Sequence, residues 1–298
     1  MPLAPAAVPL AWRTVRSSLR LDRPVIAGIL NVTPDSFWDG GRHAGVEAAV
    51  RHAAAMIDAG ADVLDIGGES TRPGASPVAA AEEAARVVPV VQALHREWPD
   101  VPISVDTVKS AVARHALDAG ASIINDVSGL RLDAALAGEI ARAGAGVVLM
   151  HSRGDIDRMA SYDLAEYGQD PVAEVRSELA EAVDRARAGG IPDDAIVVDP
   201  GLGFAKRTAH SLALLARLDR IAGLGYPVLV GPSRKRFIGD AGGRPGGDPL
   251  PIEARLEGTI AACVMALLAG ATLFRVHDVA PVRRALDFAH AARQAAGI

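Results

Sequence analysis

Eight short apolar runs, separated by longer segments of helical character, constrain the fold of this chain more than any other feature. The runs are rich in valine, isoleucine and leucine, and they do not alternate cleanly between apolar and polar residues. Such runs are typical of parallel strands that are buried on both faces of a sheet. They occupy residues 25–30, 63–66, 103–105, 123–124, 147–150, 196–198, 228–230 and 273–276.

The segments between the runs have the spacing of helices that pack on a sheet. Val46, Val50, Ala53, Met56 and Ile57 fall on one helix face. Similar segments cover residues 77–97, 108–119, 133–143, 171–190, 208–223, 251–270 and 280–296. An Ala-Gly-Ala triplet follows four of the helical segments, at 59–61, 119–121, 143–145 and 269–271. A glycine there favours the left-handed conformation that ends a helix before the next strand.

Eight strand–helix pairs in series predict an α/β fold of the closed (β/α)8 TIM barrel type. The alternative is an open doubly wound sheet, but no G-x-G-x-x-G follows the first run. We predict one barrel domain over residues 23–298, preceded by a short N-terminal extension at 1–22 that caps the barrel. The Gly- and Pro-rich stretch 239–251 is interpreted as a loop of that domain, because a further strand and helices follow it.

Composition argues against several classes of protein. The formal net charge is −5, the pI is about 5.9 and no Lys/Arg-rich run stands out, which argues against nucleic-acid binding. The longest apolar run, 260–274, is too short to span a bilayer. The N-terminus lacks the order of a secretory signal, because the first basic residue, Arg13, follows the apolar stretch. We predict a soluble cytoplasmic protein with no membrane partner, in which the single Cys263 is a buried helix residue.

Each of the eight strands ends in a polar or glycine-containing segment, and in a barrel these segments meet at one end. The polar positions are Asn31, Asp65, Arg72, Asp106, Asn125, Asp126, His151, Asp199, Ser233, Lys235, Arg275 and His277. Some of them could instead cap the helix that follows. Caps do not require potential cations to gather at the same rim. Four of these positions are Arg72, Lys235, Arg275 and His277. They indicate a polyanion such as phosphate or diphosphate.

Asp106, Asn125 and Asp199 indicate a second part of the site, because they would converge from three different strands. Carboxylate and amide oxygens suit a flat heterocycle with several N–H donors. A pterin offers a ring N–H beside an exocyclic amino group, and one carboxylate can accept from both. Burying such carboxylates alone would be costly, so they favour a ligand or a pairing lysine.

Seven sequence blocks fall at these strand ends in a fixed order. They are N-V-T-P-D-S-F at 31–37, D-I-G-G-E-S-T-R-P-G at 65–74, S-V-D-T at 104–107, I-N-D at 124–126, D-P-G-L-G-F at 199–204, S-R-K at 233–235 and R-V-H-D at 275–278. With these blocks the chain resembles the dihydropteroate synthase family from about residue 24 to the C-terminus. One block is moderately specific, and seven in order are very specific.

The resemblance implies a transferase of folate biosynthesis. It would condense 6-hydroxymethyl-7,8-dihydropterin diphosphate with p-aminobenzoate to give 7,8-dihydropteroate and diphosphate. The resemblance also implies Mg²⁺ as cofactor, held at the diphosphate by Asn31, and a homodimer formed through outer helices. In such a family the diphosphate leaves first and the aryl amine then attacks a pterin-methyl cation. No protein nucleophile is needed, and the chain has no serine elbow motif.

The family's residue roles transfer to matching positions of this chain. The residues that would bind diphosphate are Arg72, Arg275 and His277. Those that would bind the pterin are Asp106, Asn125, Asp199 and Lys235. Those that would pack near the pterin and the aryl amine are Met150 and Phe204. Those that would shape the p-aminobenzoate site are Thr71, Pro73 and Ser233, with the start of the helix after Lys235. Gly231 and Val276 would also line the substrate site. Asp35, on a mobile first loop, is counted as catalytic with Arg72, Lys235, Arg275 and His277.

Two segments depart from the family pattern. Trp38 stands where many members have a small polar residue, and S-R-G at 152–154 replaces a more frequent M-Q-G. Both could alter loop closure or inhibitor binding. Three other hypotheses stay open: a barrel aldolase that uses Lys235 as a Schiff base, a pterin-binding methyltransferase domain, and a paralogue that binds pterin without turnover.

Overall fold

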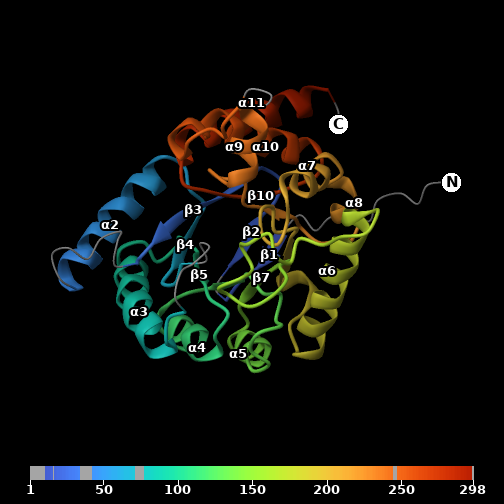
Figure 1. Ribbon diagram of the computed structural model, residues 1–298. Coiled ribbons are helices and arrows are strands. Elements are labelled where there is room, and N and C mark those ends of the chain that lie inside the picture. The colour runs from blue at the N-terminus through green and yellow to red at the C-terminus, as the bar shows by residue number, and fades with distance from the viewer. Residues whose placement is uncertain (1–10, 16, 34–41, 71–76, 244–246, 297–298) are drawn as a thin grey trace.

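Eight parallel strands form the centre of the fold and helices surround them (Figure 1). The computed structural model describes residues 11–15, 17–33, 42–70, 77–243 and 247–296. The helices and strands given below are those of the described residues. In pairing order the strands are β8 (Ile196–Asp199), β7 (Gly146–Met150), β6 (Ile123–Asp126), β5 (Ile103–Asp106), β4 (Val63–Gly67), β3 (Val25–Asn31), β10 (Leu273–Val276) and β9 (Leu229–Val230). A parallel bridge between Val198 and Val228 links β8 to the start of β9 and brings the two edges of the sheet together. The predicted (β/α)8 TIM barrel is confirmed.

The helices follow the strands as predicted, with local differences. They are α2 (Arg42–Asp58), α3 (Ala80–Glu97), α4 (Ser110–Ala119), α5 (Leu136–Ala143), α6 (Pro171–Ala188), α7 (Thr208–Ala216), α8 (Asp219–Ala222), α9 (Arg236–Gly242), α10 (Leu256–Leu268) and α11 (Val279–Ala295), with short 3-10 turns η1 (Asp193–Ala195) and η2 (Ile252–Ala254). The segment 208–223 is two helices, because the backbone leaves helical geometry at Arg217 (φ −124°, ψ 33°). The stretch interpreted as a loop begins inside α9, which buries Phe237 and Ile238.

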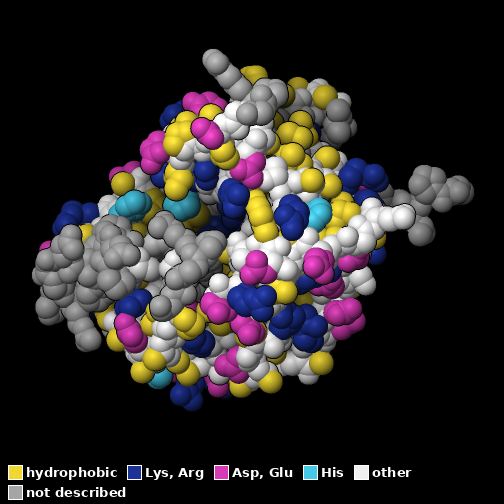
Figure 2. Space-filling model, in the orientation of Figure 1, with side chains coloured by type: hydrophobic (Ala, Val, Ile, Leu, Met, Phe, Trp, Pro, Cys, Tyr) yellow, Lys and Arg dark blue, Asp and Glu magenta, His cyan; other side chains and the backbone are white. Residues whose placement is uncertain are grey.

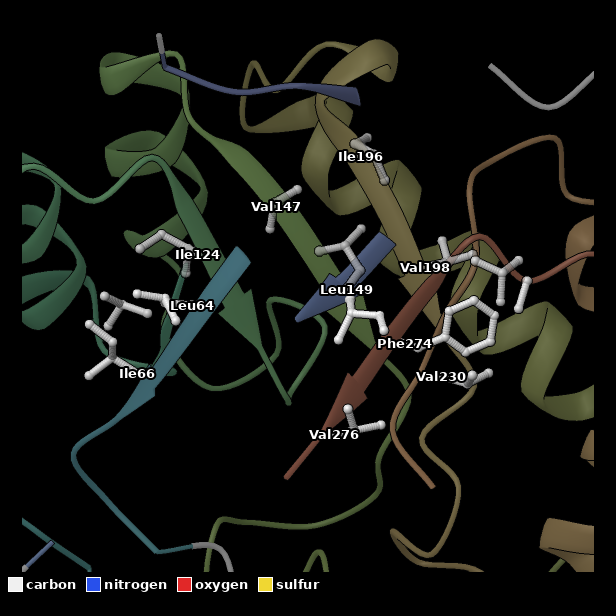
Figure 3. Packing of buried hydrophobic residues seen from close by; sticks show 14 of the residues in the cluster. Leu64, Ile66, Ile124, Val147, Leu149, Ile196, Val198, Val230, Phe274 and Val276 are labelled. Atoms are coloured by element: carbon white, nitrogen blue, oxygen red, sulfur yellow. The ribbon is translucent and has the colours of Figure 1, made fainter. Parts of the chain in front are cut away.

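The main core lies between the barrel and its helices. Its strand residues recur every second position, as in Leu64 and Ile66 of β4 or Val147 and Leu149 of β7, because alternate side chains of a strand share a face (Figure 3). The helices contribute valine, leucine and alanine from their inner faces. Cys263 belongs to this layer in α10, and burial raises the pKa of its thiol to about 12, so its prediction as a buried helix residue is confirmed.

A second, smaller core fills the barrel interior at the N-terminal ends of the strands. It contains Val25, Ala27, Val63, Ile123, Val148, Val197, Leu229 and Leu273, with Trp12 and Leu21. Trp12 lies on the hairpin of β1 (Ala11–Arg13) and β2 (Ser18–Arg20), and its indole N–H donates to the carbonyl of Ala195 at 2.9 Å. Gly146, where β7 begins, permits this approach, since a Cβ there would lie 3.0 Å from the carbonyl oxygen of Arg13 and 3.1 Å from the Trp12 ring.

No helix in the described ranges is both long enough and apolar enough to cross a membrane.

Candidate active site

The interior core sets the site, because each strand places its next inward side chain two residues further on. Counting two positions from interior core residues gives Asp65, Asn125, Met150, Asp199, Gly231 and Arg275. Asp106 and Asn31 follow from the same alternation on β5 and β3. Most of the predicted site residues in the described part of the chain therefore form the layer above the interior core. This layer lies at the C-terminal ends of the strands, where barrel enzymes carry their active sites.

Strand register brings these residues together. Asn31 of β3 pairs with Gly67 of β4, Gly67 pairs with Asp106 of β5, and Asp106 pairs with Asn125 of β6. On the other side, Met150 of β7 pairs with Asp199 of β8. The sequence prediction that Asp106, Asn125 and Asp199 converge from three strands matches this arrangement.

Arg275 lies between two carboxylates in the barrel interior. Its Nε donates to Asp65 Oδ2 at 2.6 Å and its Nη2 donates to Asp106 Oδ2 at 2.8 Å. Ser104 Oγ donates to the second oxygen of Asp65 at 2.5 Å. Burial raises the pKa of Asp106 to about 7, although the charge of Arg275 opposes the rise. Burial alone would lower the pKa of Arg275, but Asp65 and Asp106 raise it above its ordinary value, so Arg275 is a fixed cation.

Asp199 and Lys235 form an oppositely charged pair of groups on the β8–β9 side. Asp199 is buried and one of its oxygens accepts from the backbone N–H of Gly201 at 2.7 Å. Burial raises the pKa of Asp199, and the charge of Lys235 opposes that rise. Burial lowers the pKa of Lys235 to about 8. Lys235 Nζ donates to the carbonyl of Leu202 and lies 4.2 Å from the centroid of the Phe204 ring.

Ser233 and His277 meet across the ends of β9 and β10. Ser233 Oγ is 3.0 Å from His277 Nδ1, and it also accepts from the backbone N–H of His277 at 3.2 Å. Gly231 lies beside Arg275, where a Cβ would make only ordinary contact with the arginine stem. Ser233 and Lys235 follow β9, and Arg275 and His277 lie at the end of β10. Basic side chains from two neighbouring strand ends therefore border one region of the barrel mouth. Figure 2 shows Lys and Arg side chains around the hollow at the centre of this face.

Met150 and Phe204 form the apolar side of the site. Met150 packs with Val108, Val127 and Met159, and Phe204 packs against this group. Val276 is the position after Arg275, so its side chain points outward into the sheet–helix core (Figure 3). Its backbone alone borders the site.

Not every predicted residue can be placed in this site from the described part of the chain. Asp35, Thr71, Arg72 and Pro73 fall outside the described residues, as does Trp38. Asp126 has a structural role other than the helix cap that was the alternative for these positions. Its carboxylate accepts from Ser128 N at 2.8 Å and from Leu130 N at 2.5 Å and thereby fixes a turn. His151 is buried behind the site against Glu178 and Lys206.

The donor set around Asn31 suits Mg²⁺ bound together with a substrate. Asn31 ends β3 and Gly67 ends β4. The side-chain oxygen of Asn31 lies beside Gly67, 3.5 Å from where a Cβ of residue 67 would be. Within the described residues there is no group of three or more His, Cys, Asp or Glu side chains that could hold a metal. Mg²⁺ commonly keeps one or two protein oxygens and takes the rest of its ligands from phosphate and water, so a single amide oxygen is compatible with it.

Sequence reasoning gave no role to Asp65 or Lys206. Asp65 lies inside an apolar strand. A charged residue at a predicted core position could have indicated that it contributes to the site. Lys206 carried no strand or motif signal beyond following the D-P-G-L-G-F block. An open groove on the described surface lies elsewhere, between α3 and α4, and is lined mainly by alanine, valine and proline. It lacks the clustered polar groups of the barrel mouth, so we place the site at the mouth.

The fold and this site define a barrel enzyme whose polar side chains gather at the C-terminal ends of the strands. A family described as pterin binding enzyme matches residues 27–277, which places the chain in that class. The dihydropteroate synthases of Synechocystis sp. and Escherichia coli (strain K12) are each 44% identical, over 86% and 88% of this chain and 86% and 89% of their own. The solved dihydropteroate synthase of Xanthomonas albilineans matches with a TM-score of 0.86 and 45% identity over 95% of this chain and 98% of its own. The chain belongs to the dihydropteroate synthase family, whose members are transferases.

Proposed function

We propose that this chain condenses 6-hydroxymethyl-7,8-dihydropterin diphosphate with p-aminobenzoate, giving 7,8-dihydropteroate and diphosphate. The observation that carries the proposal is the convergence of Asp106, Asn125, Asp199 and Lys235 inside the barrel, above a sealed apolar layer. Structures of the Xanthomonas albilineans relative with 4-aminobenzoic acid and with 7,8-dihydropteroate support the choice of substrates.

The pterin would bind edge-on to the interior carboxylates. Asp199 has one oxygen engaged by Gly201, which leaves the other to accept from the ring N–H and the exocyclic amino group. Asn125 would supply an amide donor and acceptor beside it. Lys235 would lie along the ring, since its stem lies against Gly203 and its Nζ lies over the Phe204 ring.

Departure of diphosphate would break the bond between the pterin methylene carbon and the diphosphate oxygen, and the electron pair would leave with the oxygen. Arg275 and His277 would stand on the side where that negative charge develops, together with Arg72 by its place in the family motif. Mg²⁺, when bound at Asn31, would neutralise diphosphate charge. The carboxylates of Asp106 and Asp199 would stabilise the positive charge left on the pterin-methyl group.

The aryl amine would then attack the methylene carbon and lose a proton. Phe204 and Met150 offer an apolar wall for the benzoate ring, and Ser233 offers a hydroxyl near its carboxylate. Thr71 and Pro73 would complete this second pocket, and Asp35 would act from the first loop. Gly231 and the backbone of Val276 would border the pterin.

We also propose a homodimer formed through α10 and α11. Met265 and Leu268 of α10 and Phe288 of α11 are 49%, 62% and 77% exposed, which is unusual for large apolar side chains. Sedimentation equilibrium would detect the dimer. Phe288→Glu with Leu268→Lys is expected to give monomer, and a monomeric wild type would end this proposal.

A cytoplasmic location, a single barrel domain over 23–298 and a capping role for residues 1–22 stay predictions of the sequence. The aldolase alternative loses its support, because the chain belongs to a transferase family. Lys235 also contacts the carbonyl of Leu202 and the ring of Phe204, and it lies between two arginines in the sequence.

The test is product formation from labelled p-aminobenzoate by purified protein, with Mg²⁺ and with excess chelator. We expect dihydropteroate only with Mg²⁺. Folded protein that binds the pterin diphosphate but forms no product would favour the silent paralogue instead.

A further inference from the structure

Lys206 is a fully buried lysine that the proposed reaction does not use. It lies between β8 and α7 and is 1% exposed. The whole chain has only three lysines among its 31 Lys and Arg residues, at positions 109, 206 and 235. A buried ammonium group requires partners, so its surroundings identify its role.

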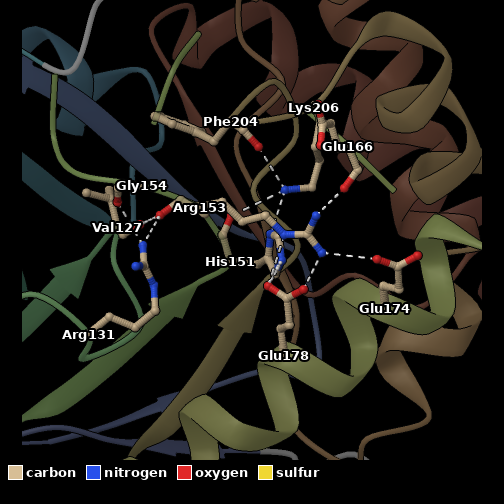
Figure 4. A network of polar contacts seen from close by, with 11 residues as sticks. Val127, Arg131, His151, Arg153, Gly154, Glu166, Glu174, Glu178, Phe204 and Lys206 are labelled. Atoms are coloured by element: carbon tan, nitrogen blue, oxygen red, sulfur yellow. Dashed lines mark hydrogen bonds and ion pairs between the residues drawn. The ribbon is translucent and has the colours of Figure 1, made fainter. Parts of the chain in front are cut away.

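Three acceptors surround the Nζ of Lys206. His151 Nδ1 lies at 2.7 Å, the carbonyl of Phe204 at 2.9 Å and the carbonyl of His151 at 3.4 Å (Figure 4). An ammonium group has three N–H donors, so this set matches its donor number. Burial lowers the pKa of Lys206, and the negative charge of Asp199 opposes that shift.

His151 is held in the tautomer that Lys206 needs. Its Nε2 lies 3.0 Å from a carboxylate oxygen of Glu178, which also accepts from Arg153 (Figure 4). Burial raises the pKa of Glu178, but the hydrogen bonds from His151 and Arg153 bring it down to about 2, so Glu178 is ionised. An ionised Glu178 requires the proton of His151 on Nε2. Burial lowers the pKa of His151 to about 4, which leaves Nδ1 free of a proton to accept from Lys206.

The group that Lys206 holds in place is the loop of residues 200–206. Gly201, Gly203 and Ala205 in this loop all have positive φ, at 66°, 81° and 46°, so the loop has a sharply turned path. Lys206 donates to the carbonyl of Phe204, and Lys235 donates to the carbonyl of Leu202. Two lysines thus hold alternate carbonyls of one loop, and the Phe204 ring faces Lys235.

We propose that Lys206 is a positioning residue for the aryl-amine pocket: seated on His151 and Glu178, it holds the Phe204 carbonyl and so fixes the Phe204 ring beside Lys235. This inference rests on the proposed function, in which Phe204 forms a wall for the benzoate ring. It goes beyond that function by assigning the control of this wall to a group that touches neither substrate.

The first test is steady-state kinetics of Lys206→Met, which keeps the length of the side chain and removes its donors. We expect the KM for p-aminobenzoate to rise about tenfold, with kcat and the dissociation constant of the pterin diphosphate each changed less than about threefold. Val183→Ala is the matched control. Val183 also lies on α6, but its side chain is buried in the main core. The substitution should lower the melting temperature without altering this KM.

A double-mutant cycle separates positioning from general stability. If Lys206 acts through Phe204, adding Lys206→Met to Phe204→Ala leaves the KM for p-aminobenzoate at the value of Phe204→Ala alone. Effects that multiply in full, or a control Val183→Ala that raises the same KM, would overturn the proposal and leave Lys206 as a stabilising residue only.

A second measurement needs no turnover. Protein labelled with ¹⁵N-lysine gives three side-chain nitrogen signals, and Lys109→Arg and Lys235→Arg assign that of Lys206 by elimination. We expect the chemical shift of an ammonium group near neutral pH. A neutral amine would overturn the three-donor contact. Because this result does not depend on catalysis, a wild type that forms no dihydropteroate would end the proposed function while the Lys206 contact is still judged on its own.

Discussion

At the scale of single residues, strand alternation decides which side chains reach the site. Asp106, Asn125 and Asp199 could be predicted because the ends of parallel strands meet, whatever the exact register. The outward direction of Val276 could not be read from an apolar run, since both faces of a buried strand are apolar. The contacts of Lys206 depend on the path of an irregular loop, for which the sequence carries no periodic signal.

Asp106 gives the site a dependence on pH. Its pKa is raised to about 7, so the carboxyl is ionised above that pH and protonated below it. Protonation of Asp106 removes the negative charge that pairs with Arg275. It also removes a hydrogen-bond acceptor for the pterin. Calorimetric titration should therefore show affinity for the pterin diphosphate falling by at most about tenfold per pH unit below about 7. Asp106→Asn should bind more weakly and lack this limb; a limb that persists in the variant would assign it to another group.

Arg275 has a geometry that lysine cannot reproduce. Its two donors reach carboxylates on different strands, at 2.6 and 2.8 Å. Arg275→Lys keeps the charge but cannot make both contacts, so we expect kcat/KM to fall about 100-fold. Arg283→Lys is the control, because Arg283 contacts Asp62 and the Pro24 carbonyl at the opposite end of the barrel. Equal rates for Arg275→Lys and wild type would contradict this role.

At the scale of elements, the strands and most helices were predictable, because each has a period that the sequence repeats. The division between α7 and α8 was not, since both parts continue one helical pattern and only the backbone at Arg217 departs from it. The helix α9 was missed at its end because its glycines read as loop, although Phe237 and Ile238 anchor it in the core.

The β8–α7 loop should be intolerant of a methyl group at Gly201. A Cβ there would lie 1.9 Å from the carbonyl oxygen of His151, at a φ of 66°. Gly144 has nearly the same φ, 65°, and nothing within 4 Å of its would-be Cβ, so Gly144→Ala measures backbone strain alone. Urea unfolding should show a loss of about 1–2 kcal/mol for Gly144→Ala and about 3 kcal/mol or more for Gly201→Ala. Equal losses would mean that the loop yields.

At the scale of the whole molecule, the barrel separates stability from chemistry. At one end the interior is apolar and packs against Trp12 of the β1–β2 hairpin, and the other end carries the polar site. The order of eight strand–helix units predicted this arrangement, because a closed parallel barrel places all strand ends of one kind together. The packing of the hairpin on the barrel was beyond the sequence, since its contacts join residues far apart in the chain, such as Trp12 with Ala195 and Arg13 with Asp194.

Trp12 should therefore contribute to stability and not to turnover. Removing its buried ring in Trp12→Ala leaves a cavity at the bottom of the barrel, and we expect the free energy of unfolding to fall by about 3–5 kcal/mol. At a temperature where the variant is folded, the KM values for both substrates should match those of the wild type. A selective rise in either KM would show that the two ends of the barrel are coupled.

The central claim is that interior carboxylates recognise the pterin, and Asp199→Asn tests it most directly. Binding of the pterin diphosphate and formation of dihydropteroate would be measured for this variant, the wild type and Asp170→Asn, which changes an exposed carboxylate at the start of α6. We predict that Asp199→Asn binds pterin about 100-fold more weakly and makes little product, while Asp170→Asn behaves as wild type. Folded Asp199→Asn with unchanged pterin affinity would contradict the account.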